Sequence, residues 1–154
     1  MAAYFVDSSA LVKRYISESG TPWMRNLCDS AAGNTLYIAR ITGAEVIAAL
    51  SRRTRMPGLT QSAAQSAMTA FRTDYASAYF VSEITASLID HAMDLAQGQG
   101  LRGYDAVQLA AALDVNAERN RYGLPALTLV SADTDLNHAA AAEGLVVENP
   151  NDYP

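Results

Sequence analysis

Cysteine, histidine and lysine are scarce in this chain of 154 residues, which has one cysteine, two histidines and one lysine. The single Cys28 cannot form an internal disulfide, so a disulfide framework is excluded and a reducing compartment is expected. His91, His138 and Cys28 lie far apart in the sequence, without the paired spacing of a structural zinc site.

Long apolar segments and targeting signals are also missing. No apolar run approaches the roughly 18 residues that a membrane-spanning helix needs. Residues 1–7 lack the basic segment followed by an apolar segment that is typical of a secretory signal. From these absences we expect a cytoplasmic protein.

Motifs of several common enzyme classes are absent, including the P-loop and the G-x-S-x-G elbow. Residues 98–103 match the pattern G-x-G-x-x-G, but a dinucleotide fingerprint must follow a strand, whereas the residues before this match have helical periodicity. We interpret the match as a turn between two helices. No internal repeat of solenoid or propeller length is present.

Basic residues are outnumbered, with 16 acids against 11 bases, a net charge of −5 and a pI near 4.8. This balance argues against the broad basic face of many nucleic-acid-binding proteins. Half of the residues are apolar and 18% are charged, which favours a folded chain over a disordered one. The length suits one domain, which we expect to cover residues 1–154.

The apolar pattern alternates between strand and helix. It predicts strands over residues 3–6, 36–39, 79–81, 127–130 and 145–147. It predicts helices that begin near residues 8, 21 and 42, with Thr21 as an N-cap, and further helices over 60–75, 85–97, 104–121 and 133–143. Nearly continuous apolar strands between helices indicate an α/β fold, with a central parallel sheet covered by helices on both faces.

Acidic residues follow three of these predicted strands. Asp7 comes directly after the first strand, Glu45 lies in the first helical turn after the second, and Asp133 and Asp135 follow the fourth. Because the carboxyl ends of parallel strands share one edge, these positions should open onto the same crevice. Asp105 lies in the first turn of its helix, but a helix precedes it, so the pattern alone does not bring it to the others.

Helix capping is an alternative role for each acid. Asp7 and Asp133 stand where N-caps are expected, and Asp105 could stabilise its helix N-terminus through the dipole. Thr42 and Glu45 have the spacing of a capping box. Serines beside Asp7 and Asp133 could have capped instead, so carboxylates at all four positions favour a shared site.

Four converging carboxylates would need a compensating charge. Two unit charges about 4 Å apart repel by about 4 kcal/mol at an effective dielectric near 20, and summed over all pairs this rivals the ~5–15 kcal/mol stability of a domain. Oxygen ligands select a hard cation such as Mg²⁺ or Mn²⁺. Such ions activate water and stabilise the leaving oxygen in phosphodiester hydrolysis, so the pattern predicts a metal-dependent phosphodiesterase site.

Four segments also carry a family resemblance that spans nearly the whole chain. They are residues 4–13 (YFVDSSALVK), 42–46 (TGAEV), 101–110 (LRGYDAVQLA) and 130–136 (VSADTDL). In this order they resemble the PIN-domain ribonucleases, particularly the VapC-type toxins of bacterial toxin–antitoxin pairs. The resemblance implies a single PIN-like nuclease domain, an RNA substrate, a homodimer and a small antitoxin that covers the site.

The resemblance also implies roles for individual residues. It implies that Asp7, Asp105 and Asp133 bind Mg²⁺ or Mn²⁺ and that Glu45 completes the catalytic acids. It brings Asp105 into the crevice, which the pattern could not do. Ser9 resembles the small hydroxyl residue of the opening motif that lies beside the site, and it is a candidate for binding substrate.

Two further residues are candidates by position. Arg102 lies three residues before Asp105 and is a candidate for binding substrate phosphate, with ordinary solvation as the alternative. Asp135 is an additional acid in the segment that carries Asp133.

Two other functions remain open. One is a PIN-like domain that has lost catalysis and acts by binding. The other is a Mg²⁺-binding signalling module that accepts a phosphoryl group on an aspartate, a design that needs a lysine near the acids. The only lysine, Lys13, lies two helical turns beyond Asp7.

Overall fold

The computed structural model describes all residues 1–154 and contains one sheet of five parallel strands in the order β3-β2-β1-β4-β5. The strands are β1 (Ala3–Val6), β2 (Thr35–Ala39), β3 (Phe80–Ser82), β4 (Thr128–Val130) and β5 (Val146–Glu148). The predicted α/β fold with an all-parallel sheet is therefore confirmed.

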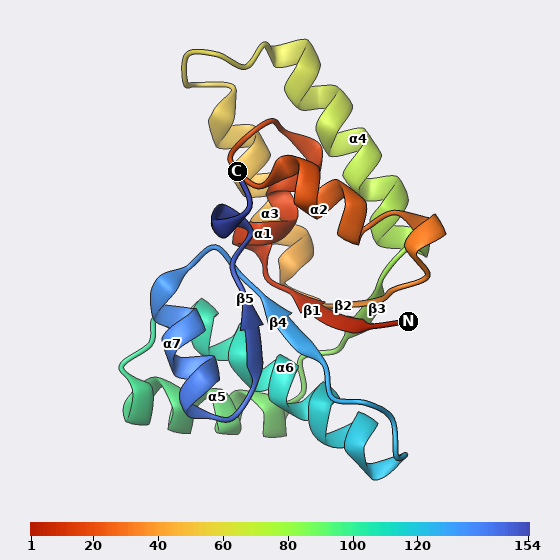
Figure 1. Ribbon diagram of the computed structural model, residues 1–154. Coiled ribbons are helices and arrows are strands. Elements are labelled where there is room, and N and C mark those ends of the chain that lie inside the picture. The colour runs from red at the N-terminus through yellow and green to blue at the C-terminus, as the bar shows by residue number, and fades with distance from the viewer.

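Helices cover both faces of this sheet (Figure 1). One face carries α1 (Ser8–Tyr15), α2 (Thr21–Leu27), α3 (Thr42–Arg53) and α4 (Gln61–Ser77). The other face carries α5 (Ala86–Gln99), α6 (Gly103–Arg121) and α7 (Thr134–Ala142). Two short 3-10 helices, Ser30–Ala32 and Pro150–Asp152, complete the chain. None of the helices is both long and apolar enough to cross a bilayer.

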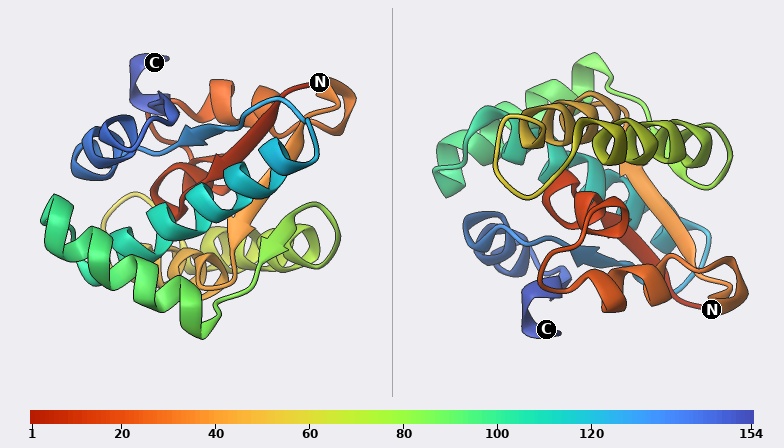
Figure 2. Two further views of the ribbon diagram at one scale, coloured as in Figure 1. Left: turned by 90° about the horizontal axis from the view of Figure 1, so that it is seen from below. Right: turned by 90° about the horizontal axis from the view of Figure 1, so that it is seen from above.

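The two faces of β1 supply two separate cores. Figure 2 shows the helices on either side of the sheet in two opposite views. Phe5 is fully buried among residues of α5, α6 and α7, whereas its neighbour Val6 is fully buried among residues of α1 to α4. Successive side chains of a strand point to opposite faces, so one central strand contributes to both cores.

The carboxyl ends of β1, β4 and β5 are joined just beyond the strands. The Asp7 backbone N–H donates to the Val130 carbonyl at 3.0 Å, and the Ser131 N–H donates to the Glu148 carbonyl at 3.1 Å. These bonds place the residues that follow β1 next to those that follow β4.

The start of α2 differs from the prediction. Gly20, and not Thr21, is the N-cap, with a left-handed φ of 84°. Thr21 is the first helical residue, and its hydroxyl donates to the Ile16 carbonyl at 3.1 Å. A Cβ on Gly20 would lie 2.2 Å from the Pro150 carbonyl oxygen, so the C-terminal segment approaches too closely for any larger residue.

We therefore predict that Gly20→Ala lowers the free energy of unfolding by about 2–4 kcal/mol, because left-handed strain and a steric clash add. Gly123→Ala is the matched control, since Gly123 has a φ of 67° and no atom within 4 Å of an added Cβ. Strain alone should cost this control about 1 kcal/mol. Urea unfolding measures both, and equal losses would contradict the close approach to Pro150.

Candidate functional site

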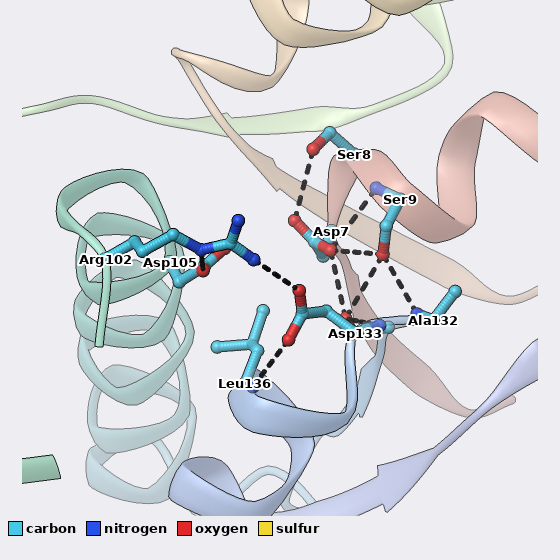
Figure 3. Close-up of polar contacts among 9 residues, drawn as sticks. Asp7, Ser8, Ser9, Arg102, Asp105, Ala132, Asp133 and Leu136 are labelled. Carbon is cyan, nitrogen blue, oxygen red and sulfur yellow. Dashed lines mark hydrogen bonds and ion pairs between the residues drawn. The ribbon is translucent and has the colours of Figure 1, made fainter. Parts of the chain in front are cut away.

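Asp7 follows β1 directly and is only 3% exposed. Its Oδ2 accepts hydrogen bonds from the Ser9 hydroxyl at 2.6 Å, the Ser131 hydroxyl at 3.0 Å and the Ser9 N–H at 3.3 Å. Its Oδ1 accepts only a longer bond, from the Ser8 hydroxyl at 3.3 Å (Figure 3). Asp7 therefore caps α1, which is the alternative role that its position indicated. Its Oδ1 is still available for a further ligand.

Two serine hydroxyls connect Asp7 to the loop after β4. The Ser9 hydroxyl accepts from the Ala132 N–H at 2.9 Å, and the Ser131 hydroxyl accepts from the Asp133 N–H at 3.1 Å. Ser131 is fully buried, and the sequence analysis did not single it out. The sequence signal for Ser131 was its position, one residue after an apolar strand and two residues before Asp133.

Arg102 connects the next two acids. Its Nε donates to Asp105 Oδ2 at 3.3 Å, and its Nη2 donates to Asp133 Oδ2 at 3.2 Å (Figure 3). The other Asp133 oxygen, Oδ1, caps α7 by accepting from the Leu136 N–H at 3.0 Å. The Arg102 side chain is 78% exposed, so it lies at the surface and is not packed into the core.

Glu45 does not form the predicted capping box with Thr42. The N-cap of α3 is Ile41, and no side chain accepts a capping bond there. Both polar side chains instead bind Gln108 of α6, whose Nε2 donates to Glu45 Oε2 at 2.7 Å and to Thr42 Oγ1 at 2.9 Å. The Glu45 carboxylate is therefore turned toward α6, because a tertiary donor replaces the local one.

We refer to Asp7, Glu45, Asp105 and Asp133 as the acidic cluster. Burial raises the pKa of Glu45, and the charges of Asp7 and Asp105 raise it further. Burial also raises the pKa of Asp105, followed by the charges of Asp133 and Asp7, while Arg102 opposes the shift. Asp7 and Asp105 therefore act on Glu45, and Asp133 and Asp7 act on Asp105, so acids from four distant segments are linked electrostatically.

Asp135 and Lys13 lie outside the cluster. Asp135 is exposed in the first turn of α7 and makes no hydrogen bond or ion pair with the cluster. Lys13 is buried and pairs with Glu18 at 3.1 Å. The signalling alternative therefore lacks the lysine that it needs beside the acids.

A cleft of about 690 Å³ opens beside the cluster. Helices α1, α3 and the start of α6 form its walls, and two arginines contribute positive charge. Its polar lining consists of Ser8, Ser9, Glu45, Arg52, Arg102 and Asp105.

The cluster offers only oxygen ligands, which suits Mg²⁺ or Mn²⁺ and not zinc or copper. Its repelling charges and the unfilled acceptor capacity of Asp7 Oδ1 also suit a cation. No three acids are close enough together to enclose an ion in this arrangement. Arg102 donates to both Asp105 and Asp133. The chemistry of the acids fits a divalent ion, whose binding would displace the exposed Arg102 guanidinium and draw the carboxylates together.

Comparisons with known proteins cover nearly the whole chain. A sequence model of the PIN domain matches residues 4–142. Ribonuclease VapC45 of Mycobacterium tuberculosis is 35% identical over 147 residues, which are 94% of this chain and 93% of that protein. The family match spans all four motif segments of the sequence.

Solved structures share the fold at low sequence identity. VapBC2 from Rickettsia felis, bound to a DNA fragment from its promoter, has a TM-score of 0.61 and 18% identity, covering 96% of this chain and 98% of the other. VapC20 of M. tuberculosis, a Sarcin-Ricin loop cleaving toxin, has a TM-score of 0.58 and 19% identity, covering 93% and 96%.

The raised pKa of Asp105 predicts a pH-dependent effect of Asp105→Asn on stability. In the unfolded chain the Asp105 carboxyl has its ordinary pKa of about 4. In the folded chain this pKa is raised, so ionised Asp105 destabilises the fold at pH values above the raised pKa. At pH values below about 4 the carboxyl is protonated in both states, and the destabilisation is absent. In EDTA, Asp105→Asn should melt at a higher temperature than the unmodified chain at pH 7, and this advantage should vanish as the pH falls to about 4.

Differential scanning calorimetry across this pH range measures the effect. Asp94→Asn, the same change at an exposed position of α5, is the matched control and should leave the melting temperature unchanged. A lower melting temperature for Asp105→Asn at pH 7 would show that its ion pair with Arg102 outweighs the repulsion.

Proposed function

The chain belongs to the PIN domain family, and from that premise we propose that it is a metal-dependent endoribonuclease that hydrolyses RNA phosphodiester bonds. The convergence of the acidic cluster beside an arginine-lined cleft is the observation that carries this proposal. The ribonuclease VapC45, which is similar over nearly its whole length, supports RNA as the substrate. One PIN-like domain over residues 1–154 suffices for this activity.

Asp7, Asp105 and Asp133 would hold Mg²⁺ or Mn²⁺, with Glu45 as the fourth catalytic acid. When bound, such an ion polarises the phosphate and lowers the pKa of water. Hydrogen bonds from Ser9 keep Asp7 oriented before the ion arrives. Ser9 lines the cleft. Because its hydroxyl already donates to Asp7, we assign Ser9 to orienting that acid and not to binding substrate.

Arg102 is the residue that we assign to substrate phosphate. Its guanidinium lines the cleft and is largely exposed, so it can leave the carboxylates without breaking core packing. Arginine binds phosphate through two parallel N–H donors. A divalent ion at the cluster would replace its positive charge at Asp105 and Asp133 and release it toward RNA.

The same similarities support a place in a toxin–antitoxin pair. VapC20 is a Sarcin-Ricin loop cleaving toxin, and VapBC2 shares the fold. We infer that this chain is a type II toxin of the cytoplasm, that it forms a homodimer, and that a small antitoxin covers its cleft. A catalytically silent binding domain is disfavoured because all four acids are present.

Asp7→Asn should reduce RNA cleavage by about 100-fold or more, since altering even an indirect partner of a metal ligand costs 10–100-fold. The fold should persist, because an asparagine can still cap α1. Cleavage of total RNA with Mg²⁺ or Mn²⁺, with and without EDTA, is the measurement, and circular dichroism checks the fold.

Asp135→Asn is the matched control, because it makes the same change at an exposed acid outside the cluster. Its cleavage rate should equal that of the unmodified chain. Undiminished cleavage by Asp7→Asn, or by the unmodified chain in EDTA, would contradict the proposed function.

A further inference from the structure

Gln108 is a polar side chain inside the apolar face of α6. It is 1% exposed, and its neighbours Leu109 and Ala110 are fully buried. Both hydrogens of its Nε2 are used, one by Glu45 Oε2 at 2.7 Å and one by Thr42 Oγ1 at 2.9 Å. Its Oε1 is buried without any partner.

The unpartnered Oε1 makes this arrangement unfavourable for folding alone. A buried amide carbonyl without a hydrogen bond costs stability, and an apolar side chain of the same size would avoid that cost. The opposite amide orientation would direct Oε1 at the Glu45 carboxylate, so that two acceptors would face each other. The observed orientation therefore directs the amide donor at Glu45 and leaves the Gln108 carbonyl without a hydrogen bond.

The position of Gln108 connects it to the cluster twice. It lies three residues after Asp105, so the two side chains share one face of α6. It reaches Glu45 on α3, which is 63 residues away in the sequence. One helix thus carries an acid of the cluster and, one turn later, the donor that orients another acid.

We propose that Gln108 is a positioning residue that fixes the Glu45 carboxylate for metal binding. This inference rests on the proposed function, which makes Glu45 a catalytic acid of the cluster, and it extends that role to contact with the metal ion. Partners that orient metal ligands typically change affinity or activity 10–100-fold when they are replaced. A purely structural link between α3 and α6 would instead act through stability.

Gln108→Met removes the amide and keeps an unbranched side chain of similar length. We expect its melting temperature to stay close to that of the unmodified chain, because removal of the unpartnered carbonyl offsets the hydrogen bonds that Thr42 and Glu45 lose. Calorimetric titration with Mn²⁺ should show affinity reduced by about 10–100-fold. RNA cleavage should show a lower kcat with an unchanged KM for RNA.

Gln108→Glu keeps the shape but presents a carboxylate oxygen to Glu45. It should bind Mn²⁺ no better than Gln108→Met, although its charge would favour a cation on electrostatic grounds alone. Mn²⁺ affinity restored to the level of the unmodified chain would overturn the requirement for a donor. A large loss of thermal stability in both variants would assign Gln108 a structural role and likewise overturn the proposal.

A double-mutant cycle with Glu45→Gln shows whether Gln108 acts through Glu45. In the Glu45→Gln background, adding Gln108→Met should leave Mn²⁺ affinity unchanged, because the Glu45 carboxylate that Gln108 orients is already absent. Additive losses, or Mn²⁺ binding by Gln108→Met equal to that of the unmodified chain, would overturn the inference alone. An unmodified chain that binds no Mn²⁺ would overturn the proposed metal site as well.

Discussion

Repulsion among four carboxylates at the carboxyl edge of the sheet is the constraint on which the rest of the site depends. The four acids receive three types of donor. Asp7 is held by the hydroxyls of Ser9 and Ser131, Glu45 by the amide of Gln108, and the other two acids share the guanidinium of Arg102. Neutral donors orient charge without cancelling it, so the cluster remains negative and suited to a cation.

The donors also differ in how easily they can leave. The serine hydroxyls and Gln108 are buried or half-buried and anchored by further bonds, whereas Arg102 is largely exposed. A cation that enters the cluster would therefore displace Arg102 first and leave the neutral donors in place. One side chain would thereby link metal binding to the exposure, at the cleft, of the group that we assign to substrate phosphate.

Local patterns were sufficient to predict the strands, their parallel arrangement and the capping residues Asp7 and Asp133. The position of Asp105 beside them could not be predicted in that way, because a helix precedes it; the family resemblance supplied it. The capping box that the spacing of Thr42 and Glu45 offered as an alternative does not form, because Gln108, 66 residues from Thr42, binds both side chains. Contacts between α3 and α6 depend on the packed fold and leave no local periodicity.

We expect that a divalent ion binds among these acids and displaces Arg102. Crystals grown with Mn²⁺ and measured near the manganese absorption edge test it most directly. The expected anomalous map has its main peak within coordinating distance of Asp7 and Asp105, with Arg102 moved away from at least one carboxylate. A peak elsewhere, or none, with Arg102 still between Asp105 and Asp133, would contradict the claim.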